Sequence, residues 1–169
     1  MSHLIATFFY AGHMRPAPGT WGSLAALPAA WVIYIFGGPW GLLIAAIASY
    51  FIGVWATEVE TRGKDDHDPS EIVIDEVCGQ WIALLPVAFG AARVEIDILA
   101  LWPGWIAAFV LFRFFDITKL GPIGWADRKK GPTGVMLDDV IAGFFAAVGV
   151  IVLAWLAHQG FVTSVPDQS

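Results

Sequence analysis

Five apolar stretches separated by polar segments constrain the fold of this chain more than any other feature of its sequence. They cover residues 22–36, 40–57, 71–90, 98–117 and 137–158. A helix needs about 20 mainly apolar residues to cross the hydrocarbon core of a bilayer. Only 14% of the residues are charged, against about 25% in a typical soluble domain. We therefore predict an all-α protein, a small multi-span membrane helical bundle that forms a single domain over residues 1–169.

Glycine and proline mark the breaks between these stretches. The Gly-Gly-Pro run at 37–39 separates the first two, which predicts a helical hairpin with a very tight turn. The Pro-Gly pair at 103–104 either kinks the fourth helix or marks its true beginning. Residues 1–17 form an N-terminal segment outside the predicted helices, and residues 160–169 form a polar C-terminal tail.

The basic residues predict an orientation in the membrane. If the five segments alternate across the bilayer, eight of the nine Lys and Arg residues share one face and only Arg93 lies opposite. The shared set is Arg15, Arg62, Lys64, Arg113, Lys119, Arg128, Lys129 and Lys130. Basic loops favour the cytoplasmic side, so we expect this face to be cytoplasmic.

Acidic residues fall on the same predicted face, and most of them lie against or inside apolar segments. They are Asp75, Glu76, Asp116, Asp127, Asp138 and Asp139. Carboxylates are costly inside a membrane and indicate a functional site there. Oxygen ligands without a Cys or His cluster favour Mg²⁺ or Mn²⁺ over Zn²⁺. Arg113, Lys119 and Arg128 alternate with these acids, and a metal site beside cations suits a phosphomonoester.

Each acidic group also has an ordinary structural interpretation. Asp138 or Asp139 could cap the N-terminus of the fifth helix, which the pair is expected to open. Asp116 could form a surface ion pair with Arg113 or Lys119. The Asp75-Glu76 pair, expected about one turn inside the third helix, could be a solvated helix start. The basic run at 128–130 could serve as an anchor on the cytoplasmic side.

Several stretches, in order along the chain, together resemble one known family. They are residues 18–24 (PGTWGSL), 67–79 (HDPSEIVIDEVCG), 112–119 (FRFFDITK), 122–123 (PI), 127–128 (DR) and 134–143 (GVMLDDVIAG). The sequence is similar to the phosphatidylglycerophosphatase A family over most of its length. It departs from the family pattern at Leu120, where a Pro is expected, and at 131–132, where consecutive glycines are expected.

The resemblance implies a multi-pass enzyme of the bacterial cell inner membrane that is a Mg²⁺-dependent lipid phosphatase with its active site at the cytoplasmic helix ends. It would convert phosphatidylglycerophosphate into phosphatidylglycerol and phosphate. The expected metal ligands are Asp75, Glu76, Asp116, Asp138 and Asp139. The expected catalytic residues are Asp75, Glu76, Asp116, Asp127 and Asp139. The expected substrate-binding residues are Thr20, Ser23, Arg113, Lys119 and Arg128. Attack by a metal-activated water and a phospho-aspartyl intermediate both stay open.

Two other classes of function compete with this interpretation. Intramembrane acids also mark ion pathways, so the chain could be a small transporter or a cation-binding membrane protein. It could also be a structural subunit whose acids bind a partner's basic patch. Transport sites usually lie near the bilayer midplane, whereas these acids are expected at helix ends on one face. We expect the lipid bilayer and a lipid substrate as partners, and no nucleic acid, because the sequence has no basic stripe.

Overall fold

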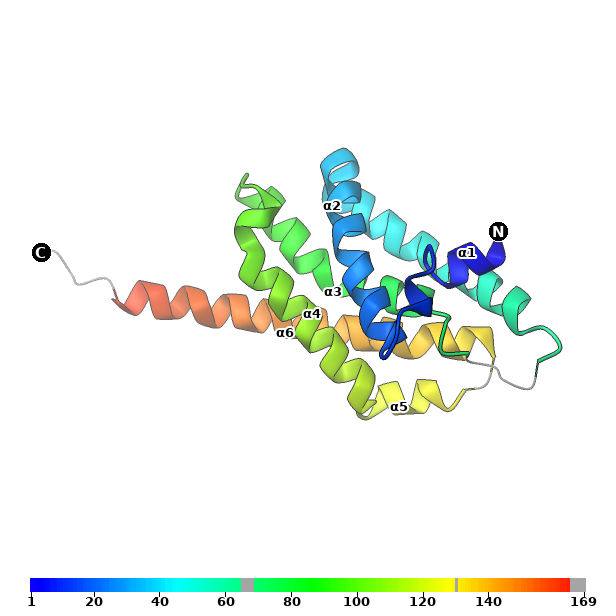
Figure 1. Ribbon diagram of the computed structural model, residues 1–169. Coiled ribbons are helices and arrows are strands. Elements are labelled where there is room, and N and C mark those ends of the chain that lie inside the picture. The colour runs from blue at the N-terminus through cyan, green and yellow to red at the C-terminus, as the bar shows by residue number, and fades with distance from the viewer. Residues whose placement is uncertain (65–68, 130, 165–169) are drawn as a thin grey trace, which may run out of the picture.

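The computed structural model describes residues 1–64, 69–129 and 131–164, with side chains through Gln159. Every secondary-structure element within these residues is a helix (Figure 1), which confirms the all-α prediction. The elements are α1 (Ser2–Ala6), η1 (Ala11–His13), α2 (Pro18–Thr61), α3 (Ile74–Arg93), η2 (Ile98–Leu101), α4 (Trp102–Thr118), α5 (Pro122–Asp127) and α6 (Pro132–Ser164). His67, Asp68, Lys130 and residues 165–169, which the sequence predictions include, lie outside the described residues.

Helix α2 is the predicted hairpin. Gly38 interrupts it with φ 59° and ψ −160°, a conformation that only glycine adopts readily. The two arms on either side of Gly38 run back along each other, as the blue-to-cyan ribbon shows in Figure 1. Four helices of the described chain are long and apolar enough to cross a membrane, and α2 contributes two arms. The expected count of about five hydrophobic segments is therefore approximately correct.

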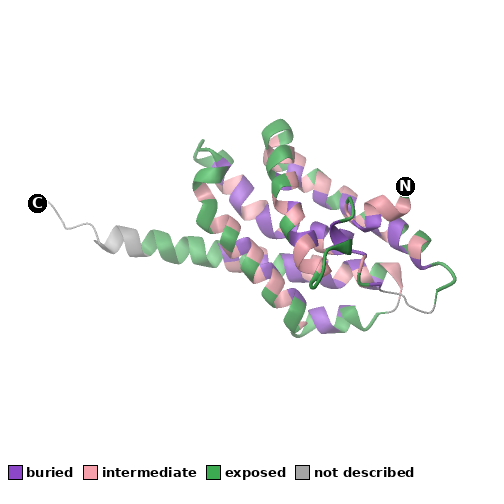
Figure 2. Ribbon diagram, in the orientation of Figure 1, coloured by how far each residue is buried: buried purple, intermediate pink, exposed green. Residues whose placement is uncertain are grey.

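Helix α3 is the centre of the bundle. In its most apolar 18-residue stretch 67% of the residues are buried, against 17% in α2 and 22% in α6. Its neighbours are both arms of α2, together with α4 and α6. Figure 2 shows the contrast, with buried residues concentrated along α3 and exposed ones along the far half of α6. The apolar outer surfaces of the surrounding helices are left for lipid.

Two glycines allow α3 and α6 to touch backbone to backbone. A methyl group placed on Gly143 would collide with the backbone carbonyl oxygen of Gly79. One placed on Gly79 would lie 2.6 Å from the carbonyl oxygen of Asp139 and would overlap the ring of Phe112. Small residues at helix crossings bring membrane helices close together in this way. Asp75 and Asp139 each lie four residues before one of these glycines, so the crossing also aligns their helical faces.

Two helices begin at places that differ from the prediction. Helix α6 starts at Pro132, so Asp138 and Asp139 lie in its second turn and neither is an N-cap. Pro132 suits a first helical turn because its missing N–H would have no partner there. Helix α3 starts at Ile74 rather than at residue 71, so Asp75 and Glu76 lie in its first turn.

The N-terminal segment contacts the start of α3. The N–H of Val73, the N-cap residue of α3, donates to the carbonyl oxygen of Ala6 at 2.9 Å. Residues 1–17 are thus part of the packed structure, with α1 lying on α2.

The structure confirms one of the two alternatives expected at Pro103 and differs from the loop expected at 118–134. Pro103 lies in the first turn of α4, so the Pro-Gly pair marks the helix beginning and does not kink it. The expected polar loop at 118–134 contains the short helix α5. Positive φ values at Lys119 (49°) and Gly121 (56°) end one helix and start the next.

We predict that Gly143→Ala destabilises the protein by about 1–3 kcal/mol, the usual cost of overpacking a well-packed contact. The added methyl group must push α3 and α6 apart. The measurement is the free energy of unfolding in detergent. Gly37→Ala is the matched control, because a methyl group there meets nothing within 4 Å. Equal stability of the two variants would contradict the backbone contact.

Candidate active site

A polar cavity of about 320 Å³ opens where the first turn of α2, the start of α3, the end of α4 and α6 meet. Seven charged side chains line it, namely Asp75, Glu76, Arg113, Asp116, Lys119, Asp138 and Asp139. The remaining wall comes from Ala17, Pro18 and Gly19 at the start of α2 and from Ser70 and Ile72 before α3. The structure therefore gathers all five predicted metal ligands, and two of the three predicted cations, around one space.

Three of the carboxylates are close enough to share one cation. Asp75, Glu76 and Asp139 each offer an oxygen, and the three oxygens lie within 4.8 Å of one another. Glu76 Oε2 is buried and has no hydrogen-bond partner among the described residues. A buried carboxylate oxygen without a partner is costly, and a bound cation would remove that cost. Hard oxygen donors of this kind fit Mg²⁺ or Mn²⁺.

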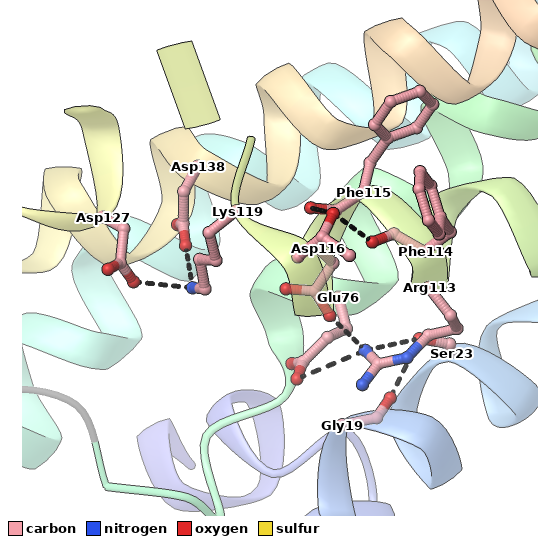
Figure 3. Close-up of polar contacts among 11 residues, drawn as sticks. Gly19, Ser23, Glu76, Arg113, Phe114, Phe115, Asp116, Lys119, Asp127 and Asp138 are labelled. Atoms are coloured by element: carbon pink, nitrogen blue, oxygen red, sulfur yellow. Dashed lines mark hydrogen bonds and ion pairs between the residues drawn. The ribbon is translucent and has the colours of Figure 1, made fainter. Parts of the chain in front are cut away.

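Arg113 connects three elements at the cavity wall (Figure 3). Its Nη1 lies 2.5 Å from Asp116 Oδ2 and 3.9 Å from Glu76 Oε1. The same nitrogen donates to Ser23 Oγ at 3.5 Å, and Ser23 Oγ donates to the carbonyl oxygen of Gly19 at 2.9 Å. The pairing of Arg113 with Asp116, one of the ordinary interpretations of that acid, is therefore real. It is largely buried, however, and it lies inside the cavity rather than on an open surface.

Lys119 lies apart from Arg113 in Figure 3, beside Asp127 and Asp138. Its Nζ donates to Asp138 Oδ2 at 2.5 Å and to Asp127 Oδ1 at 2.6 Å. Burial alone would lower the pKa of Lys119, but the hydrogen bonds that it donates to Asp127 and Asp138 outweigh burial and raise that pKa. Lys119 is therefore charged at neutral pH and offers a fixed cation to an anionic ligand.

Four of the predicted residues do not line the cavity, namely Thr20, Ser23, Asp127 and Arg128. Ser23 reaches the cavity wall through its contact with Arg113. Asp127 is 44% exposed and meets the site only through Lys119. Arg128 is exposed beside α5, and Thr20 is partly exposed in the first turn of α2. Helix α2 begins at Pro18, four residues before the first apolar stretch at 22–36, so Thr20 and Ser23 both lie in its first two turns.

Two residues beyond the predicted set take part in the site or lie next to it. A side chain on Gly19 would collide with Glu76 Oε1. Glycine at this position therefore lets the Glu76 carboxylate lie against the first turn of α2. Gln80 lies one helical turn after Glu76 on α3 and is completely buried. Neither polar atom of its amide has a partner among the described residues. A buried polar residue in an apolar run was the sequence signal that could have identified it.

Comparison with known proteins agrees with this geometry. The family model for phosphatidylglycerophosphatase A matches residues 4–154. The chain is 36% identical over 154 residues to phosphatidylglycerophosphatase A of Haemophilus influenzae, covering 90% of this chain and 88% of the relative. It is 37% identical over 148 residues to phosphatidylglycerophosphatase A of Escherichia coli K12, covering 86% of this chain and 78% of the relative.

A third relative carries a different name. The chain is 36% identical over 159 residues to a protein of Bacteroides thetaiotaomicron named "Putative phosphatidylinositol-3-phosphatase", covering 90% of this chain and 93% of the relative. No solved structure gave a significant match to the chain. The family predicted from the motifs is confirmed by the family model and by the first two relatives. The chain therefore belongs to the phosphatidylglycerophosphatase A family of lipid phosphatases.

Proposed function

We propose that this protein hydrolyses phosphatidylglycerophosphate to phosphatidylglycerol and phosphate, and that it needs Mg²⁺ to do so. The observation that carries the proposal is that three carboxylates converge in one polar cavity beside Arg113 and Lys119. Family membership supports the same reaction. The product phosphatidylglycerol would serve bacterial phospholipid biosynthesis.

Asp75, Glu76 and Asp139 would hold the metal ion, with Asp116 and Asp138 beside them on the cavity wall. Bound there, Mg²⁺ would neutralise charge on the phosphate and lower the pKa of a coordinated water. In the reaction the oxygen of a water molecule bonds to phosphorus while the bond from phosphorus to the glycerol oxygen breaks. A proton ends on the departing alcohol. The two charged side chains that could stabilise the phosphoryl oxygens are Arg113 and Lys119.

Neighbouring residues position these cations. Asp116 and Ser23 hold Arg113 from two sides, and Asp127 and Asp138 hold Lys119. A guanidinium held in this way is preorganised and needs little rearrangement when charge develops on the substrate. We assign Asp127 this positioning role because it contacts Lys119 and not the cavity.

We further propose that the cavity faces the cytoplasm across the bacterial inner membrane. The cavity lies at the end of the bundle that carries most of the basic residues, and basic loops favour the cytoplasmic side. A headgroup could enter there from the inner leaflet while its acyl chains stay among lipid. The position also argues against transport, because ion pathways place their acids near the midplane.

A second candidate substrate follows from the third relative. That protein is named a putative phosphatidylinositol-3-phosphatase. The cavity of this chain could therefore accept an inositol phosphate headgroup in place of glycerophosphate. The test compares phosphate release from phosphatidylglycerophosphate and from phosphatidylinositol 3-phosphate in the same micelles. The proposed function is supported if kcat/KM is at least about tenfold higher for phosphatidylglycerophosphate, a difference of about 1.4 kcal/mol. A higher kcat/KM for phosphatidylinositol 3-phosphate would make the inositol lipid the preferred substrate instead.

We predict that purified protein releases phosphate from phosphatidylglycerophosphate with Mg²⁺ and loses this activity with a chelator. Glu76→Gln and Asp139→Asn should each lower kcat/KM by about a hundredfold or more, because even indirect supports of a metal site typically contribute about 10–100-fold. Glu58→Gln is the control, since Glu58 only pairs with Arg62 on the surface. Chelator-resistant activity, or full activity in both variants, would refute the metal site.

We predict opposite effects on stability and on activity for Gln80→Leu. Replacing an unpaired buried amide by an apolar side chain removes a cost of about 1–3 kcal/mol, so the free energy of unfolding should rise. If the amide serves the neighbouring site, kcat should nevertheless fall. Thr57→Val is the control, because its buried hydroxyl also lacks a partner among the described residues. Neither residue lines the cavity, but Gln80 lies one turn from Glu76 on α3 whereas Thr57 lies on α2. Unchanged kcat in Gln80→Leu would show that the amide has no part in the reaction.

A further inference from the structure

The N-terminal segment enters the bundle and leaves it again before α2 begins. At its start, Ser2 Oγ donates to Glu60 Oε1 at 2.6 Å, next to the end of α2. In its middle, the ring of Phe8 packs edge-on against Trp81 of α3, with ring centroids 6.2 Å apart. Near its end, Gly12 lies directly against the backbone of Glu71, which precedes α3. The segment therefore has its deepest point near Phe8.

The depth of that point can be estimated along α3. Trp81 follows the first residue of the helix, Ile74, by seven positions. At a rise of 1.5 Å per residue this is about 10 Å inside the bundle end. The interfacial layer on each side of the hydrocarbon core is roughly 5–8 Å thick. With the start of α3 at the membrane surface, Phe8 lies at the boundary between headgroups and acyl chains.

The backbone N–H groups of this turn are satisfied by hydrogen bonds within the N-terminal segment. Every N–H from Thr7 to Met14 donates within the segment. Seven of them bond to backbone carbonyls of residues 3–11, and the N–H of Tyr10 bonds to the hydroxyl of Thr7. A loop in water can leave donors to the solvent, whereas non-helical backbone at membrane depth must satisfy them internally.

The turn presents the side chains of Phe9 and Tyr10 outward at a conformational cost. Phe8, Phe9 and Tyr10 have φ values of 41°, 55° and 67°, a region that side chains other than glycine rarely adopt. Phe9 is 72% exposed and Tyr10 is 57% exposed. Large aromatic rings that face outward beside membrane-spanning helices are typical of the lipid interface. Trp55 and Val59, near the end of α2, are also exposed.

We propose that the turn Phe8–Tyr10 is a re-entrant element whose partner is the lipid interface, into which Phe9 and Tyr10 insert. From this turn the chain runs directly to Ala17, Pro18 and Gly19, which form one wall of the cavity. The inserted turn thus holds that wall at the level of the lipid headgroups, where a phosphorylated headgroup enters.

The test measures where the turn lies in liposomes. The background is Cys78→Ala, since Cys78 is the one cysteine of the chain. An environment-sensitive NBD fluorophore is attached to Phe9→Cys or, separately, to Tyr10→Cys. Lys64→Cys, in the exposed loop after α2, is the aqueous control, and Ile44→Cys, exposed on α2, is the lipid control.

At positions 9 and 10 we expect blue-shifted emission and quenching by nitroxide-labelled lipids, as at position 44. Strong quenching by aqueous iodide at both positions, as at position 64, would overturn the proposal. The unmodified protein gives a second measurement that needs no variant. A photoactivatable lipid should crosslink to residues 4–15, and its absence from that peptide alongside labelling of α2 would equally overturn the proposal.

Discussion

The backbone contact between Gly79 of α3 and Gly143 of α6 is the constraint on which the rest of the structure depends. It brings two helices to a separation that any side chain would prevent. Because Asp75 and Asp139 lie one turn before these glycines, the same contact brings their carboxylates together at one end of the bundle. The closeness of these carboxylates is thus a consequence of helix packing in the apolar interior.

Bringing carboxylates together in an apolar protein is unfavourable unless opposite charge balances them. Arg113 and Lys119 supply part of that balance through ion pairs to Asp116, Asp138 and Asp127. Asp75, Glu76 and Asp139 form a group of three oxygens for which a divalent cation is the natural counter-charge. Arg113 also lies 3.9 Å from Glu76. The two cations and the three-oxygen group face one cavity, which is the arrangement that phosphoryl transfer requires.

Much of this arrangement could be predicted from the sequence, because hydropathy and charge report on it directly. The hairpin at Gly38, the helical class and the gathering of Asp75, Glu76 and Asp139 all follow from such patterns. The contact of the N-terminal segment with the start of α3 could not be predicted, because the hydrogen bond from Val73 to Ala6 joins residues that are far apart in the chain. The roles of Gly79 and Gly143 also depend on tertiary contact, since neither glycine carries a side chain whose chemistry would reveal them.

The most direct test of the central claim is to count bound metal. Titration of the purified protein with Mn²⁺, followed by electron paramagnetic resonance, reports free and bound ion without any need for turnover. We expect saturable binding that Mg²⁺ displaces, that Glu76→Gln weakens strongly, and that Gly143→Ala weakens because it separates the two helices that supply the ligands. Equal binding by the wild type and both variants would contradict the account.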